Sequence, residues 1–375
     1  MNLSMIETRL GNLFKNRRET GEKGLPVLSV TMNSGIVNRE TLSRKMAPDL
    51  PPEKSLLVRS GDIVYNMMRM WQGAVAVVRQ DGLVSPAYVV CRPNGNIDSQ
   101  FAYYFFKTPV MLHKLKSYSH GITGDRLRLY YKDFAAIPVR IPLLKIQKTI
   151  SEILSVWDTA IKKSVRLVQA KEKNLKGQIQ RLISQQCDSW PHIKLKNIFD
   201  TITEKNFPNE ELLSVTQGRG VIPRNMLEGR VMSPNGTTEG YKRIKRGDFA
   251  ISLRSFQGGI EYSNCQGIIS PAYTVLRPKI ELNSDFYRLF FKSYIFIEKY
   301  LELAVIGIRD GKQISIPDFL SVQIPFPSLE EQQQIAKILT IAQQEIDLLK
   351  QLEEKYKTQK RGLMQKLLTG EVRLN

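Results

Sequence analysis

The sequence predicts an α+β (mixed α/β) protein with two pseudo-symmetric globular domains, each built on a curled β-sheet, and two long antiparallel coiled-coil helices that separate them. Two observations predict this architecture. Motifs from the first half of the chain return in the second half at a constant distance, which indicates a duplicated unit. Each copy ends in a stretch of roughly 40 residues whose apolar residues recur every three or four positions, as in a long helix.

The repeat has an offset of 185 residues, since 214 − 29 and 270 − 85 give the same value. Leu-Ser-Val-Thr occupies residues 28–31 and 213–216, and Ser-Pro-Ala-Tyr occupies residues 85–88 and 270–273. The offset is nearly half of the 375 residues. The chain is therefore almost entirely two tandem copies of one unit.

Residues 1–142 are expected to form the first globular domain, and residues 188–326 the second. Turn-forming sequences such as Pro51-Pro52 and Ser60-Gly61-Asp62 separate short apolar runs. In the first domain these runs predict strands at 62–65, 74–78 and 88–91, and helices at 6–14 and 101–113. The second domain repeats the order and ends in a predicted helix at 285–303.

Residues 143–187 and 327–375 are expected to form the two long helices. The stretch 144–186 contains no proline and one glycine, and the steps between its apolar residues mark one face of a helix. A period close to seven is typical of a coiled-coil seam. The predicted seam residues are Ile150, Trp157, Ile161, Val168, Ile179, Ile335, Leu339, Ile346, Leu349 and Leu363.

Each of these helices has an apolar face that a lone helix would expose to water. Two related helices in one chain bury these faces most simply against each other, and an antiparallel pair places one globular domain at each end. At a rise of 1.5 Å per residue, ~40 residues give a rod of roughly 60 Å. The sequence therefore predicts a stiff spacer between two similar domains.

The formal net charge is +19 and the isoelectric point is about 9.7. Nucleic acid is the usual partner of such a charge, because lysines and arginines that meet phosphates release condensed counterions; a merely basic protein is the alternative. The three cysteines lack zinc-ligand spacing, and their odd number argues against a disulfide framework. Without a long apolar span or a signal peptide, we expect no membrane contact and a cytoplasmic location.

Two motifs at the ends of the second long helix carry a family resemblance. Pro-Phe-Pro-Ser-Leu-Glu-Glu-Gln-Gln-Gln-Ile at 325–335 opens it, and Lys-Arg-Gly-Leu-Met-Gln-Lys-Leu-Leu-Thr-Gly at 360–370 closes it. The first helix has a degraded opening at 141–147, which lacks the Glu-Gln pair, and keeps Lys-Gly-Gln-Ile-Gln at 176–180. Over its whole length the chain resembles the specificity subunit of a type I restriction-modification system.

This resemblance implies two target recognition domains joined by a central and a distal conserved helix. Each domain would read one half of an asymmetric, bipartite site on double-stranded DNA. The helices would set the gap and dock two methyltransferase subunits, through which restriction subunits join. The resemblance implies no catalysis and no cofactor on this chain, with S-adenosylmethionine, ATP and Mg on the partner subunits.

Two alternatives remain at the level of the sequence. In a related system, the same kind of subunit serves a single partner polypeptide that combines methylation and cleavage, and the co-purifying chains distinguish this case. A DNA-binding coiled-coil protein that acts alone, such as a regulator, would bind its sequence tightly without any methyltransferase.

The internal repeat sorts the candidate DNA-binding residues. Positions that are alike in both copies cannot distinguish two different half-sites, so they favour scaffold or phosphate roles, whereas differing positions on the same element favour base reading. The alike candidates are Arg69, Gln72, Arg254 and Gln257. The differing candidates lie in the loops 121–132 and 307–315 and are Arg126, Arg128, Tyr130, Lys132, Arg309, Lys312 and Gln313. Secondary candidates from another divergent segment are Arg44, Lys45 and Arg224.

Ser-Pro-Ala-Tyr resembles the catalytic loop of amino-methyltransferases, although alanine replaces a proline. The motif occurs twice, and no glycine-rich loop with the required strand and helix lies near either copy. We therefore expect it to mark the start of a strand. No phosphate-binding loop is present, and the three histidines are too isolated to predict a metal site.

Overall fold

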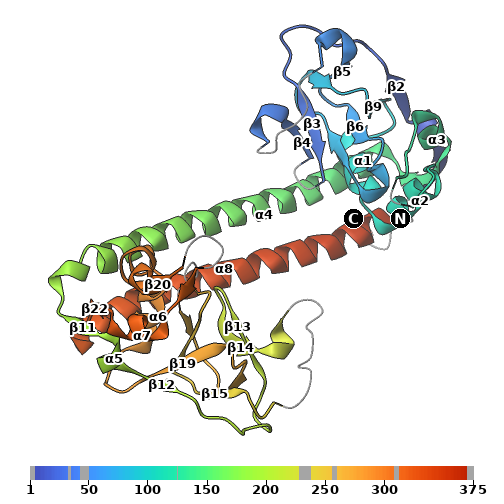
Figure 1. Ribbon diagram of the computed structural model, residues 1–375. Helices are drawn as coiled ribbons and strands as arrows, with labels where there is room; N and C mark the ends of the chain where they lie inside the picture. Colours follow the sequence, from blue (N-terminus) through green and yellow to red (C-terminus); the bar gives the residue numbers. More distant parts are fainter. Residues whose placement is uncertain are drawn as a thin grey trace. The chain divides into compact units, whose positions relative to one another are not determined.

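The computed structural model describes residues 5–32, 35–42, 50–124, 126–227, 238–255, 260–307 and 312–369. It consists of two compact units, residues 1–164 with 352–375 and residues 165–351, which we call unit 1 and unit 2. Each unit combines a globular part with segments of both long helices, α4 (Leu144–Ile179) and α8 (Leu329–Thr369) (Figure 1). The domain boundaries at 142/143, 187/188 and 326/327 stay predictions.

The centre of unit 1 is a four-stranded antiparallel sheet with the strand order β2-β9-β6-β7. Its strands are β2 (Phe14–Arg17), β6 (Ile63–Asn66), β7 (Val75–Val77) and β9 (Tyr88–Pro93). Successive side chains of a strand point to opposite faces, so Ile63 and Tyr65 join one hydrophobic core and Val64 joins another. The sheet is therefore buried on both faces.

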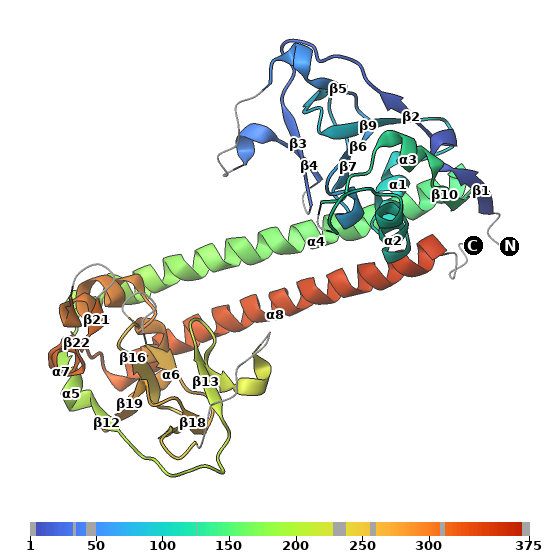
Figure 2. The ribbon, with the colours of Figure 1, turned by 45° about the vertical axis from the view of Figure 1, so that its right-hand side comes forward.

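Helices cover one face of this sheet and β-ribbons cover the other (Figure 2). The helices are α1 (Ser99–Phe106), α2 (Pro109–Ser117) and α3 (Tyr131–Ala136). The ribbons pair β3 (Leu28–Thr31) with β4 (Gly35–Asn38) and β5 (Leu56–Val58) with β8 (Gly82–Val84). The predicted mixture of helices and short strands is confirmed.

Two of the helices predicted in unit 1 are wrong in part. Residues 6–14 form β1 (Met5–Arg9), a short 3₁₀ turn (Leu10–Asn12) and the start of β2, because β1 pairs with β10 (Pro138–Pro142) far along the chain. Residues 101–113 are divided between α1 and α2. Thr108 caps α2 and Pro109 begins it, and a proline has no N–H with which to continue the preceding helix.

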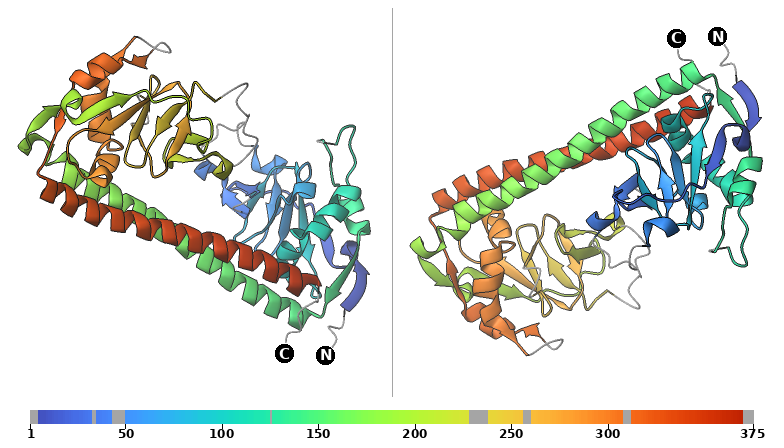
Figure 3. Two further views of the ribbon diagram at one scale, coloured as in Figure 1. Left: turned by 90° about the horizontal axis from the view of Figure 1, so that it is seen from below. Right: turned by 90° about the horizontal axis from the view of Figure 1, so that it is seen from above.

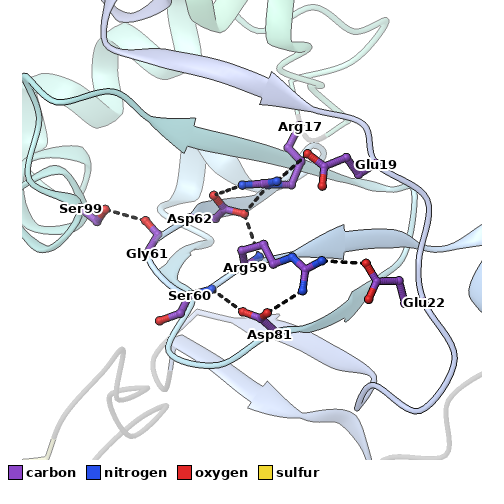
Figure 4. Close-up of polar contacts among 9 residues, drawn as sticks. All are labelled: Arg17, Glu19, Glu22, Arg59, Ser60, Gly61, Asp62, Asp81 and Ser99. Atoms are coloured by element: carbon purple, nitrogen blue, oxygen red, sulfur yellow. Dashed lines mark hydrogen bonds and ion pairs between the residues drawn. The ribbon is translucent and has the colours of Figure 1, made fainter.

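A shared glycine-aspartate turn precedes the central strand of each sheet. In unit 1, the buried Asp62 accepts hydrogen bonds from Arg59 N at 2.9 Å and from Arg17 Nε at 2.8 Å (Figure 4). In unit 2, Asp248 accepts from Lys245 N at 2.9 Å and from Arg277 Nη2 at 2.8 Å. These contacts are internal to each turn and its neighbouring strands, so Asp62 and Asp248 have a structural role.

Unit 2 repeats the architecture of unit 1. Its four-stranded sheet has the order β12-β19-β16-β17, and the same two faces separate Phe249 and Ile251 from Ala250. The strands of the sheet are β12 (Phe199–Ile202), β16 (Phe249–Ser252), β17 (Glu261–Tyr262) and β19 (Tyr273–Pro278). The ribbons pair β13 (Leu213–Thr216) with β14 (Gly220–Pro223) and β15 (Lys242–Ile244) with β18 (Gly267–Ile269).

The remaining elements of unit 2 flank this sheet. They are β11 (His192–Lys194) paired with β22 (Gln323–Pro325), β20 (Val305–Ile306) paired with β21 (Gln313–Ile314), and the helices α5 (Leu195–Ile198), α6 (Ser284–Phe290) and α7 (Ile316–Ser321). The prediction of a single helix at 285–303 is wrong. This segment instead contains α6, a π-helical turn (Phe296–Tyr300) and a 3₁₀ turn (Leu301–Ala304).

Within each unit, a segment of α4 runs antiparallel to a segment of α8 (Figure 3). In unit 1, Ile150 and Leu154 share a core with Leu367 and Leu368. In unit 2, Lys171 and Glu345 pair across the two helices at 2.7 Å, next to a core that contains Val168 and Ile346. The prediction of long antiparallel helices is confirmed.

Candidate nucleic-acid interface

In unit 1, the turn after β6 and the loop before α3 enclose a surface pocket of about 1020 Å³, here called the unit 1 pocket. The sequence placed the candidates on these two segments in separate groups, one alike and one different between the copies. The structure brings five of them together around the pocket. They are Arg69, Gln72, Arg126, Arg128 and Tyr130.

The turn after β6 is held by its own side chains. Asn66 Oδ1 accepts from Met68 N at 2.9 Å, and Trp71 Nε1 donates to Met68 O at 3.0 Å. Gly73 ends the turn with a φ of 89°, a left-handed conformation that favours glycine. Between these anchors, Arg69 and Gln72 are exposed.

The loop before α3 is a hairpin closed by backbone hydrogen bonds. His120 N donates to Arg128 O at 2.9 Å, and Arg128 N donates to His120 O at 2.8 Å. A Cβ atom on Gly121 would lie 2.4 Å from Arg126 O, so only glycine allows the two arms to approach this closely. Leu129 N donates to Met67 O at 2.9 Å and ties the hairpin to the turn after β6.

The end of the hairpin alternates between buried and exposed residues. Leu129 is fully buried, whereas Arg126, Arg128 and Tyr130 are exposed. In an extended chain, residues two apart point to the same side, so Arg128 and Tyr130 share one side, opposite Leu129. Arg126 lies in the turn that precedes them, and all three side chains line the unit 1 pocket.

The electrostatic character of the unit 1 pocket is cationic. Arg69, Arg126 and Arg128 carry a permanent positive charge, and none of the described residues that line the pocket is a carboxylate. Nearby, Lys116 Nζ lies 5.5 Å from the Trp71 ring centroid and adds to the charge. Guanidinium groups donate to phosphate oxygens and to the acceptor edge of guanine, so the pocket has the chemistry of a DNA contact.

Other sequence candidates of unit 1 lie apart from this pocket. Lys132 is exposed in the first turn of α3 but does not line the pocket. Arg44 and Lys45 lie outside the described residues.

The candidates of unit 2 lie on the equivalent segments. Arg254 is exposed in the turn after β16, and Gln313 is exposed at the start of β21. Lys312 donates to Glu302 at 3.2 Å, so its charge is already paired within the unit. Gln257 and Arg309 lie outside the described residues.

Arg224 was assigned to a segment that differs between the two copies, and the structure corrects this assignment. Arg224 begins a 3₁₀ turn (Arg224–Met226) after β14, and its N–H donates to Leu212 O at 3.2 Å. Arg39 begins the matching turn (Arg39–Thr41) after β4, and its N–H donates to Val27 O at 2.9 Å. The two arginines are therefore alike, and the same logic now favours a positioning role for Arg224.

Within each unit, most of the predicted seam residues pack in or against the hydrophobic core that contains residues of both α4 and α8. In unit 1, the Trp157 and Tyr356 rings meet edge to face with centroids 5.9 Å apart. Ile150 and Leu363 belong to or pack against the unit 1 core, and Ile161 lines a neighbouring pocket. The seam residues in or against the unit 2 core are Val168, Ile179, Ile335, Leu339, Ile346 and Leu349.

Ser-Pro-Ala-Tyr forms a turn at the start of β9 and of β19. Ser85 Oγ accepts from Ala87 N at 3.3 Å, and Ser270 Oγ accepts from Ala272 N at 3.4 Å. Within the described part of the chain, no group of three or more histidine, cysteine, aspartate or glutamate residues could hold a metal ion. No helix of the described residues is long and apolar enough to cross a membrane.

Comparison with known proteins places this geometry in a family. The model of the type I restriction modification DNA specificity domain matches residues 4–171 and again residues 188–357. The chain belongs to this family. The two matches coincide with the two copies of the repeat, so each copy is one specificity domain in the family's sense.

Relatives in the family cover nearly the whole chain. The specificity subunit of the type I restriction enzyme MjaVIII from Methanocaldococcus jannaschii is 26% identical over 360 residues, which span 86% of this chain and 81% of the relative. The S subunit of a type I restriction-modification system from M. genitalium has a TM-score of 0.61 at 15% identity, over 100% of this chain and 98% of that one. The HsdS subunit from Thermoanaerobacter tengcongensis has a TM-score of 0.51 at 18% identity, over 98% and 97% of the two chains. At such identities, the two structures show that the fold of a specificity subunit is shared.

Sequence comparison missed several residues of the unit 1 pocket. Met68 and Ile122 line it and are exposed, Ile122 completely. Exposed apolar side chains beside arginines suit contact with sugar rings and thymine methyl groups. Their signal in the sequence was weak, because an apolar residue in a loop is indistinguishable from a core residue until its burial is known.

Proposed function

We propose that this specificity-domain protein is the DNA-recognition subunit of a type I restriction-modification complex and that each globular domain reads one half of an asymmetric bipartite site. The observation that carries the proposal is the unit 1 pocket. It combines residues that both copies share, Arg69 and Gln72, with residues that only the first copy has, Arg126 and Arg128. A reader of two different half-sites needs both kinds.

The two kinds of residue have different tasks in this proposal. Arg69 and Arg254 contact phosphates and set the position of each domain on the duplex, which requires the same contact in both copies. The hairpin residues differ between the copies and read base edges in the major groove. Arg224, as an alike residue, joins the positioning group.

The partners are two methyltransferase subunits, through which restriction subunits join. The candidate docking surface is formed by exposed apolar residues on the long helices, outside the seam. In unit 2, Ile338, Ile341 and Leu348 of α8 are 48%, 57% and 65% exposed. In unit 1, Val156 of α4 is 68% exposed and is the counterpart of Ile341, since 341 − 156 is 185. An exposed apolar residue at this equivalent position of each copy suits two identical partners.

The chemistry belongs to those partners. S-adenosylmethionine, ATP and Mg would bind to the methyltransferase and restriction subunits, and this chain would supply the address. The lengths of α4 and α8 would set the spacer between the half-sites, because a coiled coil resists bending where a flexible linker would accept many spacers.

A domain exchange tests the proposal. Residues 191–325 are replaced by the matching domain of another specificity subunit, and the methylated sites of cells that carry the complete system are mapped. Only one half of the target should change. A change in both halves, or in neither, contradicts the two-reader proposal.

A second experiment tests the spacer. One heptad is inserted into each long helix, in phase with the seam. The spacer should lengthen by several base pairs while both half-sites stay the same. An unchanged spacer in an active complex contradicts the role of the helices.

A further inference from the structure

Arg128 and Gln313 occupy the same position in the two units. Arg128 closes the hairpin of unit 1 by pairing with His120. Gln313 closes the hairpin of unit 2 by pairing with Ile306 in the two strands β20 and β21. The two residues are also 185 positions apart, because 313 − 128 equals the offset of the repeat.

The residues that follow Arg128 and Gln313 support this structural equivalence. Leu129 and Ile314 are buried, with exposed fractions of 0% and 1%. Leu129 N donates to Met67 O, directly after β6, at 2.9 Å. Ile314 N donates to Leu253 O, directly after β16, at 2.7 Å. Five positions later, Phe134 and Phe319 are completely buried in the cores of their units. A buried residue on one side fixes Arg128 and Gln313 on the other, exposed side.

Neighbouring positions are less suited to reading bases in both copies. Lys312 is paired with Glu302, and its counterpart Leu127 has no polar group. Ser315 caps α7 by accepting from Asp318 N at 3.4 Å, whereas its counterpart Tyr130 forms no cap hydrogen bond. At 128/313, in contrast, both copies present a long polar side chain on the exposed side.

We propose that Arg128 and Gln313 determine specificity at corresponding positions of the two half-sites. This inference rests on the proposed function and deepens it. An arginine donates two hydrogen bonds to O6 and N7 of guanine, whereas a glutamine accepts from N6 and donates to N7 of adenine. The half-site of unit 1 therefore contains a guanine at the position where the half-site of unit 2 contains an adenine.

The test exchanges the two side chains in the complete complex of this chain with its methyltransferase partner. The complex selects sites from a pool of duplexes in which both half-sites are randomised, and the domain exchange above assigns each half-site to its unit. Arg128→Gln should change one guanine of the unit 1 half-site to adenine. Gln313→Arg should change one adenine of the unit 2 half-site to guanine.

The expected preference at the changed position is roughly 5- to 160-fold, the range that a good bidentate contact provides. Arg140→Gln is the matched control, because it makes the same substitution at an exposed arginine of unit 1 that does not line the unit 1 pocket. It should leave both half-sites unchanged. Thermal unfolding of each variant identifies one that fails to fold, and the reciprocal variant in the other unit then decides the question.

Several outcomes overturn the inference while leaving the proposed function intact. They are a wild-type unit 1 half-site without guanine, a folded Arg128→Gln variant that keeps its base preference, or one that weakens binding equally for all bases. A wild-type complex that selects no bipartite sequence overturns the proposed function itself.

Discussion

Gln147 and Gln332 make the same connection in the two units, each between the start of a long helix and the start of a helix in the globular part. Gln147 Oε1 accepts from Asp98 N at 2.9 Å, and its Nε2 donates to Pro142 O at 2.8 Å. Gln332 Oε1 accepts from Asn283 N at 2.8 Å, and its Nε2 donates to Pro327 O at 2.9 Å. Asp98 and Asn283 are the N-caps of α1 and α6. Each glutamine therefore anchors a long helix to its own domain.

Gln332→Ala should lower the free energy of unfolding by about 2–3 kcal/mol, because the partly buried Asn283 N and the buried Pro327 O would lose their hydrogen-bond partner. Gln332→Glu should also destabilise the protein, since a carboxylate accepts but does not donate. Urea unfolding followed by circular dichroism measures both changes.

Gln333→Ala is the control for this prediction. Gln333 is the next residue of α8 and is exposed, so its loss should change the unfolding free energy by less than about 0.5 kcal/mol. Equal effects of the substitutions at 332 and 333 would contradict the anchoring role.

The sequence predicted much of the fold because duplication and helical periodicity are local or self-comparing signals. The second long helix was predicted within residues 327–375, and α8 is observed from Leu329 to Thr369. The segment 6–14 was wrong because β1 is a strand only through its pairing with β10, where Ile6 faces Ile141. Local propensity does not contain that distant partner. The role of Gln147 was also overlooked. The opening at 141–147 lacks the glutamate of the Glu-Gln pair but keeps its glutamine, because Gln147 corresponds to Gln332.

The candidate site could be predicted only in part, because identity in two copies does not guarantee the same role. Arg92 and Arg277 are alike by position, yet Arg277 pairs with Asp248 while Arg92 is exposed. In unit 1, Arg17 of a different strand pairs with the aspartate instead. Likewise, the two groups of candidates around the unit 1 pocket are about 50 residues apart in the chain, and their proximity depends on the hydrogen bond between Leu129 N and Met67 O.

Arg69→Ala should weaken DNA binding by the assembled complex without changing either half-site. In the proposed function, Arg69 contacts a phosphate, and each such contact contributes about 0.9 to the slope of log K against log salt. The slope should become less steep by about that amount. Fluorescence anisotropy at several salt concentrations, together with site selection, measures both quantities.

Arg140→Ala serves as the control for this experiment. Arg140 is an exposed arginine of β10, with 67% of its side chain accessible, and it does not line the unit 1 pocket. Its loss removes the same charge and should leave the salt slope nearly unchanged. If Arg69→Ala instead relaxes one base of the target, the residue reads a base and the division of tasks is wrong.

Ile341→Glu should weaken assembly with the methyltransferase by roughly tenfold or more, because it places a charge in the proposed apolar docking surface. Ile341 is 57% exposed and lies outside the seam, so folding should be preserved. Analytical ultracentrifugation of the mixed subunits measures assembly. Gln333→Glu introduces the same charge at an exposed position of α8 about two turns before Ile341 and should assemble normally. Normal assembly of the Ile341→Glu variant would remove this surface from the proposal.

Gly121→Ala should abolish recognition of the unit 1 half-site while leaving the global unfolding free energy nearly unchanged. The added Cβ would lie 2.4 Å from Arg126 O, so the hairpin must open and Arg126 and Arg128 must move. Gly124→Ala, three residues away in the same loop, is the matched control, since its Cβ would meet no atom within 4 Å. Site selection by the assembled complex should show an unchanged unit 2 half-site and a randomised unit 1 half-site for Gly121→Ala only. If both variants keep the complete target, the geometry of this hairpin has no part in reading DNA.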